Sequence, residues 1–184
     1  NVVLQVLEKT REIKSETDVW LIFAPIKLFR MNITIQKATE LGISRFIPCI
    51  TQNTNQVKIN TRNLKMNIIE ASEQSERLSL PPIDEPTKLK SLVENFPKDR
   101  CLIFCNEKHE NLPMIYEALS KKIDKYKKWA VIIGPEGGFS KEEIDKITSL
   151  PSSISVSLGE RILRSDTATT AAIFSLQSLV ENKK

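Results

Sequence analysis

Residues 129–140 read WAVIIGPEGGFS, which is the part of the sequence with the clearest local signals. An apolar run of strand length, 129–133, leads directly into a loop that contains three of the five glycines of the chain. Ser140 then begins a helix, because Glu143 three residues later completes a Ser-x-x-Glu capping box. A strand that passes through a glycine-rich loop into a capped helix is typical of α/β proteins, which bind ligands at the carboxyl ends of their strands.

The same alternation continues outward in both directions. Strands are predicted at 18–25, 46–50, 101–105, 129–133 and 154–158, and helices at 31–41, 62–78, 87–94, 114–123, from 140 onward, and at 164–180. Alternating strands and helices predict an α/β fold with a mainly parallel sheet and helices on both faces. Ligand-binding residues are therefore expected in the loops after Cys105, Ile133 and Leu158.

Composition excludes several classes of protein. A chain of 184 residues with 40% hydrophobic and 27% charged residues is globular and large enough for one well-packed domain. Aromatic residues make up only 6%, which argues against a base-stacking platform for single-stranded nucleic acid. The longest apolar run, 20–26, is too short to cross a bilayer, and the chain does not open on a signal peptide. The net charge of +4 permits a polyanionic partner without requiring one.

The three cysteines do not form a disulfide framework or a metal site. Cys101 and Cys105 lie four residues apart in a strand-like run, without C-x-x-C spacing, and Cys49 lies alone in another such run. With a single histidine in the chain, we expect no zinc or other metal ion. Free buried thiols favour a reducing, cytoplasmic environment.

The glycine-rich loop matches neither common phosphate-binding pattern, because it lacks both G-x-G-x-x-G and a following Gly-Lys-Ser/Thr. Two interpretations remain open: a tight strand-to-helix turn, or a loop whose backbone approaches a ligand or another chain segment closely.

Two further clusters are candidates for function. Residues 157–168 read SLGERILRSDTA, and Ser165 or Thr167 could cap the helix that follows. Arg164 in this cluster either pairs with Asp166 or Glu160, or remains free for a ligand. Residues 70–77 read EASEQSER, which is either a solvated helix end with Arg77 complementing the helix dipole or a polar binding face.

Four motifs together resemble a known family. They are RM followed by TIQKATELG within 30–42, EASEQSER at 70–77, GPEGGFS at 134–140 and LGERILRSDT at 158–167. Their types and order are similar to those of the RsmE-type 16S ribosomal RNA methyltransferases, which belong to the SPOUT (α/β-knot) class. The resemblance covers residues from about 18 to 180.

The resemblance implies a deep trefoil knot near the C-terminus, an exception to the rule that chains do not thread loops. It also implies S-adenosylmethionine as cofactor, an obligate homodimer, and a cytoplasmic enzyme. The implied reaction is methylation of N3 of a uridine in the decoding region of 16S rRNA, within the small ribosomal subunit. A PUA-like RNA-binding domain normally precedes the catalytic domain. Residues 1–16 are therefore expected to be its last strand, at 2–7, and a linker, and residues 17–184 the methyltransferase domain.

The same resemblance assigns the cofactor site. Apolar side chains of Ile133, Ile162 and Leu163 would enclose the adenine, while backbone groups of the loops would bind its edges and the ribose. Polar groups after Cys105 would take the ribose hydroxyls or the amino-acid end. The complete predicted set is Cys105, Asn106, Glu107, Ile133, Gly134, Pro135, Glu136, Gly138, Leu158, Gly159, Ile162 and Leu163.

Methylation at N3 of uridine requires loss of a proton and stabilisation of the resulting anion. Arg164 is the first candidate for that stabilisation, and Arg77, from a partner subunit or a neighbouring face, is the second. The residues do not identify a general base, and Asp166, Glu136 and water all remain open. The predicted RNA contacts are Lys27, Arg30, Gln74, Arg77 and Arg161.

The homodimer is expected to form through the helix at 31–41 and the last helix. The last helix carries a stripe of small residues, namely Ala168, Ala171, Ala172 and Ser175. The chain also departs from the family pattern: Asn53 stands where an Arg is common, Glu160 replaces a Pro, and Glu76 precedes Arg77. Two other functions remain open, a SPOUT methyltransferase acting on tRNA or on a ribose 2′-hydroxyl, and a non-catalytic RNA-binding module.

Overall fold

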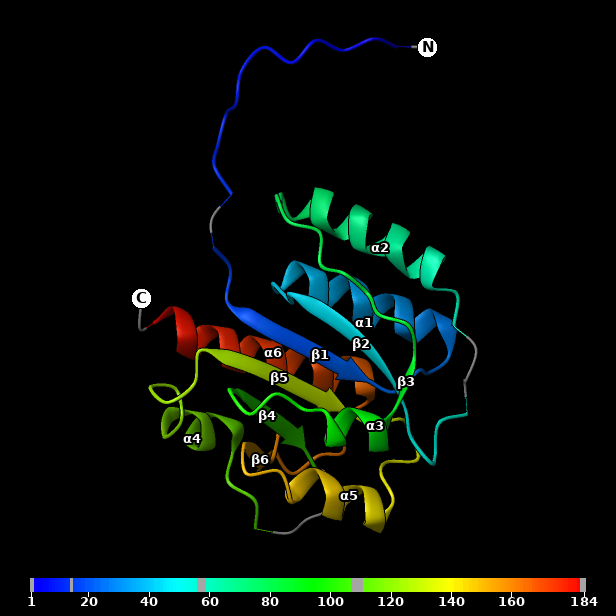
Figure 1. The fold of residues 1–184 in the computed structure, drawn as a ribbon, viewed down its shortest axis with the longest axis vertical. Coiled ribbons are helices and arrows are strands. Elements are labelled where there is room, and N and C mark those ends of the chain that lie inside the picture. Colours follow the sequence, from blue (N-terminus) through cyan, green and yellow to red (C-terminus); the bar gives the residue numbers. More distant parts are fainter. Residues whose placement is uncertain (1, 14, 56–58, 107–110, 183–184) are drawn as a thin grey trace.

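The computed structural model describes residues 2–13, 15–55, 59–106 and 111–182 (Figure 1). Six strands form one sheet in the order β3-β2-β1-β5-β4-β6, and every pairing between these described strands is parallel. The predicted α/β fold with a mainly parallel sheet is thus confirmed. The strands are β1 (Asp18–Phe23), β2 (Arg45–Ile50), β3 (Thr87–Lys88), β4 (Arg100–Cys105), β5 (Lys128–Ile133) and β6 (Ser153–Val156).

Helices cover both faces of the sheet, as predicted. They are α1 (Leu28–Glu40), α2 (Thr61–Gln74), α3 (Leu89–Glu94), α4 (Ile115–Ser120), α5 (Lys141–Thr148) and α6 (Ser165–Glu181). The core beside one face draws apolar side chains from α1, α2, α4 and α6. The core beside the other face draws them from α3 and α5. Because both faces are covered, the central strands β1, β4 and β5 form continuous apolar runs after a charged first residue, rather than alternating polar and apolar residues.

The predicted helix boundaries agree with local capping signals. Ser140 and Glu143 form the capping box at the start of α5, with the Ser140 hydroxyl accepting from the Glu143 amide at 3.3 Å. Gly42, which follows α1, has a φ of +81°, the left-handed conformation that glycine adopts readily after a helix.

Several predicted elements differ from the structure, and the helices predicted at 62–78 and 114–123 end earlier, at Gln74 and Ser120. The helix predicted at 87–94 is divided, because Thr87 and Lys88 pair with the end of β2 before α3 begins. The last helix begins at Ser165 without a side-chain cap, so the predicted capping by Ser165 or Thr167 is wrong. The Ser165 hydroxyl instead donates to the carbonyl of Gly134 at 3.0 Å, which is a contact between distant segments that local sequence cannot reveal.

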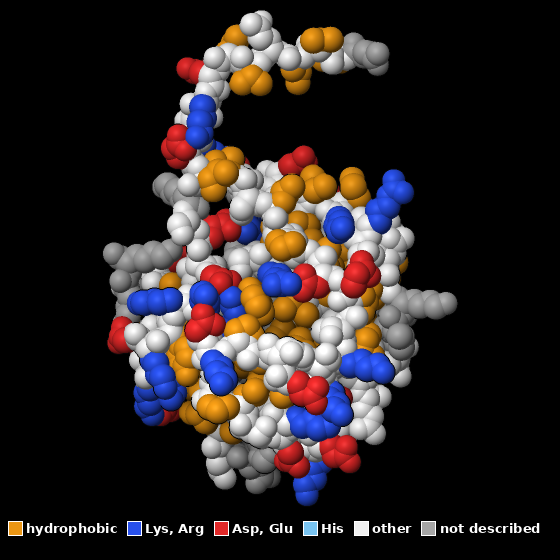
Figure 2. Space-filling view, viewed as in Figure 1, with side chains coloured by type: hydrophobic (Ala, Val, Ile, Leu, Met, Phe, Trp, Pro, Cys, Tyr) orange, Lys and Arg blue, Asp and Glu red, His pale blue; other side chains and the backbone are white. Residues whose placement is uncertain are grey.

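Residues 2–13 extend away from the body of the molecule without regular secondary structure (Figures 1 and 2). Residues 2–7 therefore form no strand in this structure, whereas the assignment of residues 1–16 to a preceding RNA-binding domain and a linker stays a prediction. The apolar side chains of residues 2–7 are exposed, with Val3 at 93%, and no described strand lies beside this segment to complete a backbone ladder. On the face shown in Figure 2, basic and acidic side chains are interspersed.

Within the described residues, no helix has the length and apolar character needed to cross a membrane. The same residues contain no group of three His, Cys, Asp or Glu side chains arranged to hold a metal ion.

Candidate active site

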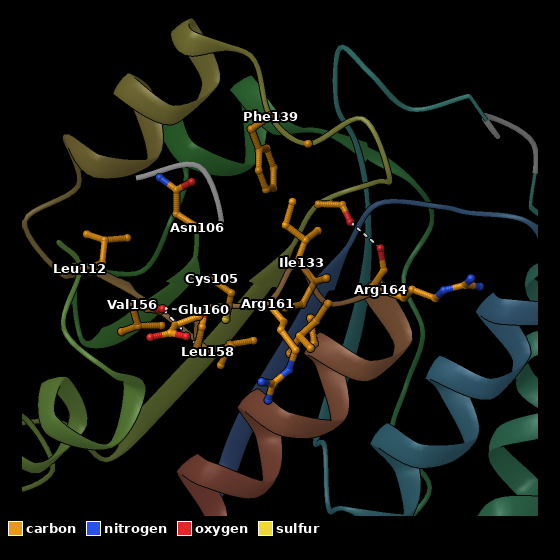
Figure 3. Close-up of a pocket in the computed structure, with 18 of the residues that line it drawn as sticks. Cys105, Asn106, Leu112, Ile133, Phe139, Val156, Leu158, Glu160, Arg161 and Arg164 are labelled. Carbon is orange, nitrogen blue, oxygen red and sulfur yellow. Dashed lines mark hydrogen bonds between the residues drawn. The ribbon is translucent and has the colours of Figure 1, made fainter. Parts of the chain in front are cut away.

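A pocket of about 770 Å³ lies at the carboxyl ends of β4, β5 and β6 (Figure 3). This volume falls within the range of ordinary small-molecule sites. The pocket is bounded by the segments that follow these three strands, namely 105–114, 133–139 and 156–165, of which 107–110 lie outside the described residues. The edge of the sheet predicted to bind a ligand is therefore the edge that carries the cavity.

The structure brings the predicted cofactor residues together. Glu107 lies outside the described residues, and every other member of the predicted set lines the pocket. These are Cys105, Asn106, Ile133, Gly134, Pro135, Glu136, Gly138, Leu158, Gly159, Ile162 and Leu163.

Each of three glycines in the pocket lining occupies its position for a different structural reason. Gly134 lies against the ring of Phe139, and a Cβ at position 134 would come within 2.7 Å of that ring. Gly138 has a φ of +66° and donates its amide to the carbonyl of Pro135 at 2.9 Å, which closes the turn. Gly159 has a φ of +119°, and a Cβ there would have no neighbour within 4 Å. A side chain at position 134 would thus lack space, and one at position 138 or 159 would be disfavoured by the positive φ. At these positions the loops present backbone to the pocket.

Hydrogen bonds connect the loops that surround the pocket to each other and to the neighbouring helices. The Ser165 hydroxyl joins the start of α6 to the loop after β5. The amide of Gly159 donates to the Ser157 hydroxyl at 3.1 Å. The carbonyl of Ser157 accepts from the amide of Ile115 at 3.0 Å, which links the loop after β6 to α4. The pocket is therefore built from distant segments that support one another.

Cys105 forms part of the apolar wall of the pocket. Cys105 is half-buried, and desolvation raises the pKa of its thiol to about 12. Burial likewise raises the pKa values of Cys49 and Cys101 to about 12. A thiol that stays protonated at neutral pH is a poor nucleophile, so Cys105 contributes shape and low polarity rather than covalent chemistry.

Two arginines lie at the edge of the pocket. Arg161 and Arg164 both line it and are exposed, and in the described part of the chain neither has an ion-pair partner. Figure 3 shows Arg164 at the rim, with its side chain directed away from the centre of the cavity. Of the two interpretations of Arg164, the ion pair with Asp166 or Glu160 is wrong: within the described residues Arg164 forms neither pair, and Asp166 binds Arg30 at 2.9 Å.

The predicted RNA contacts do not form one cluster. Lys27 is exposed just before α1, and Gln74 is exposed at the end of α2. Arg30, through its ion pair with Asp166, connects α1 to the start of α6. Of the predicted RNA-binding residues, only Arg161 lines the pocket.

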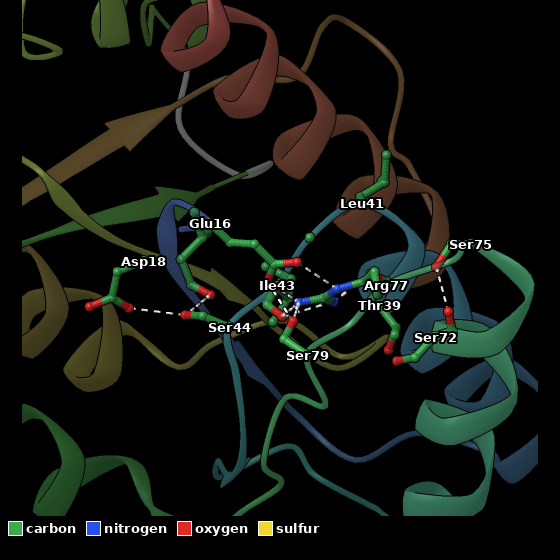
Figure 4. Close-up of polar contacts among 12 residues, drawn as sticks. Glu16, Asp18, Thr39, Leu41, Ile43, Ser44, Ser72, Ser75, Arg77 and Ser79 are labelled. Carbon is green, nitrogen blue, oxygen red and sulfur yellow. Dashed lines mark hydrogen bonds and ion pairs between the residues drawn. The ribbon is translucent and has the colours of Figure 1, made fainter. Parts of the chain in front are cut away.

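Arg77 lies outside the pocket, in a closed polar network (Figure 4). Its guanidinium donates to the carbonyl of Thr39 at 2.7 Å and to that of Ile43 at 3.2 Å. It also binds the Glu16 carboxylate and the Ser79 hydroxyl, and its side chain is only 8% exposed. Each guanidinium nitrogen already donates, so any catalytic or RNA-binding role of Arg77 remains a prediction that requires it to leave these partners.

The small-residue stripe of α6 is partly used inside the chain. Ala168 and Ala172 belong to the core shared with α1 and the sheet, whereas Ala171 and Ser175 are half-buried. Small residues here let α6 lie close to its own neighbours, which is a physical role different from the predicted dimer contact.

Sequence analysis missed several apolar residues of the pocket. Phe139 lies under Gly134 and packs edge-on against Phe104 at 5.3 Å. Leu112 and Met114 line the opposite side, from the segment after β4. The available signal was the apolar residues that interrupt the polar run between β4 and α4, but their direction depends on the tertiary fold.

Comparison with known proteins agrees with the resemblance to RNA methyltransferases that the sequence motifs indicate. The family model of the RNA methyltransferase domain matches residues 13–177. Ribosomal RNA small subunit methyltransferase E of Rickettsia conorii is 32% identical over 181 residues, which cover 97% of this chain and 72% of that protein. The protein of the same name from Mesomycoplasma hyopneumoniae is 30% identical, with coverage of 97% and 76%.

Solved structures agree with these relatives. The structure of ribosomal RNA small subunit methyltransferase E from Neisseria gonorrhoeae, bound to S-adenosylmethionine, has a TM-score of 0.77 and 27% identity over 93% of this chain and 70% of that one. A SpoU methyltransferase from Streptomyces viridochromogenes, 16% identical over 92% of this chain and 62% of that one with a TM-score of 0.59, shares the fold. From its motifs, its pocket and these relatives, the chain belongs to the RsmE family of small-subunit ribosomal RNA methyltransferases.

Proposed function

We propose that this chain binds S-adenosylmethionine in the pocket at the carboxyl ends of β4, β5 and β6. We further propose that it transfers the methyl group to N3 of a uridine in the decoding region of 16S rRNA, in the cytoplasmic small ribosomal subunit. The observation that carries the proposal is the convergence of the predicted cofactor residues on one cavity. A family member from Neisseria gonorrhoeae has been solved with the same cofactor bound.

The residues of the pocket fit this cofactor. Ile133, Leu158 and Leu163 offer apolar surface for a flat heteroaromatic ring, while the loop backbones offer amides and carbonyls for its polar edges. The open space beside Gly159 is the kind of cradle that a Cβ would fill. Asn106, which is only 6% exposed, supplies a polar side chain within the lining.

Bound S-adenosylmethionine would supply a methyl group already activated on a sulfonium, so the protein has to prepare the nucleophile. Loss of the N3 proton leaves negative charge on the uracil ring, and a preorganised cationic donor can stabilise it. Removal of one such donor typically lowers turnover about 100- to 1,000-fold. Arg164 suits this role, because it is cationic, exposed at the pocket rim and has no ion-pair partner in the described residues.

The proton needs an acceptor, and two carboxylates lie near the pocket. Asp166 is held by Arg30, and its side chain is only 12% exposed. Glu136 is exposed in the pocket lining. We therefore favour Glu136, directly or through water, over Asp166 as the group that receives the proton.

We also propose that the chain acts as a homodimer through the outer faces of α1 and α6. Support comes from large apolar side chains that the fold leaves exposed there, with Phe29 at 74% and Phe174 at 62%. Light scattering at micromolar concentration should give twice the 20.9 kDa mass of the chain. A wild-type mass of one chain would contradict the dimer. A dimer that persists when both phenylalanines are replaced with serine would contradict this interface.

A deep trefoil knot in the C-terminal half is part of the same proposal. In support, β6 lies at the edge of the sheet, whereas α6, the next element in sequence, packs against α1 and β5 at the middle of the sheet. Stretching single molecules by their termini tests the knot, because an unknotted chain extends by about 3.5 Å per residue. A knotted chain should fall short of that length, and full extension would contradict the knot.

The reaction is tested by mapping methylated nucleotides of 16S rRNA by mass spectrometry, from cells with and without the gene. A methyl group on N3 of a uridine, lost without the gene and restored by the wild-type copy, is the expected result. A Gly134→Val copy serves as the matched control that should not restore it. Methylation of tRNA or of a ribose hydroxyl would support another SPOUT activity. RNA binding without any methylation would support a non-catalytic module.

A further inference from the structure

One departure from the family pattern lies directly against the glycine-rich loop. Asn53, in the loop after β2, donates its side-chain amide to the carbonyl of Gly137 at 3.1 Å and to that of Gly138 at 3.1 Å. Both partners are acceptors, so the side-chain nitrogen, and not the oxygen, must face them. One amide group thus holds two consecutive peptide units of the loop.

A second contact joins the same two segments. The carboxylate of Glu143 accepts from the backbone amide of Gln52 at 2.8 Å through one oxygen. Its other oxygen accepts from the amide of Ser140 at 3.0 Å, within the capping box of α5. The loop after β2 is therefore bonded both to the glycine-rich loop and to the helix that follows it.

The loop after β2 is itself shaped to present Asn53. The Thr54 hydroxyl accepts from the backbone amide of Thr51 at 2.9 Å and lies 2.8 Å from the Thr51 hydroxyl. Gly137 fits closely against it, because a Cβ at position 137 would come within 3.1 Å of the Asn53 Cβ. The contact is thus a packed fit as well as a pair of hydrogen bonds.

We infer that Asn53 is a positioning residue, which fixes the glycine-rich loop in its ligand-binding shape without touching the ligand. Asn53 does not line the pocket, but Gly138, which it holds, does. Gly138 has a φ of +66° and closes the turn at 135–138 from the inside through its bond to Pro135. Asn53 holds the same turn from the side away from the pocket. Without Asn53 the loop would be less ordered in the free protein, and ordering it when the ligand binds would reduce the affinity.

The inference rests on the proposed function for its consequence in binding, but the loop contact can be tested without any ligand. Hydrogen exchange of residues 134–140, followed by mass spectrometry in the free protein, reports the order of the loop directly. In Asn53→Ala we expect faster exchange there, with exchange in β1 and β5 unchanged. Unchanged exchange at 134–140 would overturn the inference, whether or not the chain binds S-adenosylmethionine.

Binding supplies the second measurement. Loss of two hydrogen bonds to the loop should weaken S-adenosylmethionine about tenfold in Asn53→Ala. Asn95→Ala is the matched control, because Asn95 also donates its amide to a backbone carbonyl, that of Ser91 at 2.8 Å, but lies outside the pocket lining. If the wild-type chain does not bind the cofactor, the proposed function fails; if wild type and Asn53→Ala bind equally, only the positioning role fails.

Asn53→Asp separates positioning from a general loss of stability. An aspartate at this position has the same shape, but as a carboxylate it faces two carbonyl oxygens and cannot donate to them. An ordinary aspartate has a pKa of about 3.9, so at neutral pH it stays ionised, and Asn53→Asp should weaken the cofactor at least as much as Asn53→Ala does. An Asn53→Asp variant that binds the cofactor as tightly as wild type would contradict the positioning role.

Discussion

The two ends of the parallel sheet both carry arginines, but in opposite states. At the amino end, Arg100 is buried with its side chain 3% exposed, and it binds both oxygens of Asp18 at 2.6 Å and 3.0 Å. It also donates to the carbonyl of Trp129 at 2.7 Å and lies 3.6 Å from the ring centroid of Trp20. At the carboxyl end, Arg161 and Arg164 are exposed, without ion pairs in the described residues.

This difference separates arginines that hold the fold from arginines that are available to a substrate. Arg100 is buried against a carboxylate and an aromatic ring, and both of its terminal nitrogens donate hydrogen bonds within the protein. A guanidinium that lies beside a cavity and forms no ion pair with the described residues has hydrogen-bond donors available to a ligand. Arg77 belongs with Arg100, because carbonyls and the Glu16 carboxylate already satisfy it.

The largest effect is expected at the carboxyl end, from Gly134→Val. The new side chain would collide with the Phe139 ring, which lies 2.7 Å from the position of even a Cβ. The loop must then move into or away from the pocket, so calorimetry should detect no binding of S-adenosylmethionine. The protein should remain folded by circular dichroism, and unchanged affinity in a folded variant would contradict the assigned site.

Arg164→Ala should lower turnover about 100- to 1,000-fold, because it removes a donor that acts on the developing charge. Cofactor affinity should stay within about threefold of wild type, since the side chain points out of the cavity centre (Figure 3). The comparison is Arg161→Ala, which should mainly raise KM for RNA and reduce the salt dependence of binding by about one phosphate contact. Equal turnover of Arg164→Ala and wild type would remove Arg164 from the mechanism.

At the amino end, Arg100→Ala should affect stability rather than binding. Removal of Arg100 leaves the carboxylate of Asp18, which is 39% exposed and can be solvated, so the cost should be about 1–2 kcal/mol, measured as the free energy of unfolding in urea. Lys90→Ala is the control, because its exposed pair with Glu94, at 3.9 Å, should contribute less than about 0.5 kcal/mol. A loss of cofactor affinity in Arg100→Ala at temperatures where it is fully folded would contradict the division between the two ends.

The smallest effect is the pH dependence of the same ion pair. Burial alone would raise the pKa of Asp18, but hydrogen bonds and the charge of Arg100 outweigh it and lower the pKa below the ordinary 3.8. A lowered pKa in the folded state means that the stabilisation is complete above pH 3.8 and is lost as the pH falls below it. The difference in unfolding free energy between wild type and Asp18→Asn should therefore shrink at acid pH. A difference that does not change with pH would argue against the pair.

The parts of the fold that sequence predicted are those with local signals. The capping box at Ser140, the glycine after α1 and the run of apolar residues in β5 each depend on neighbours within a few positions. The glycine-rich loop alone left open either an ordinary turn or a ligand-binding loop, and the family resemblance assigned it to the cofactor. These signals sufficed to locate the pocket.

The parts that sequence could not predict depend on partners far along the chain. Arg30 and Asp166 are separated by 136 residues, and nothing near either residue indicates that they pair. Arg77 looked available because its acceptors are backbone carbonyls of Thr39 and Ile43, which are invisible in a list of side chains. Likewise, Asn53 looked like the loss of an arginine until its contacts with the glycine-rich loop were seen.

The most direct test of the central claim is a crystal structure of the chain grown with S-adenosylmethionine. We expect the adenine to lie against Ile133 and Leu163, and the rest of the cofactor within the three loops after β4, β5 and β6. The sulfonium methyl group should face the rim that carries Arg164. Cofactor bound elsewhere on the chain, or a methyl group facing away from that rim, would contradict this claim.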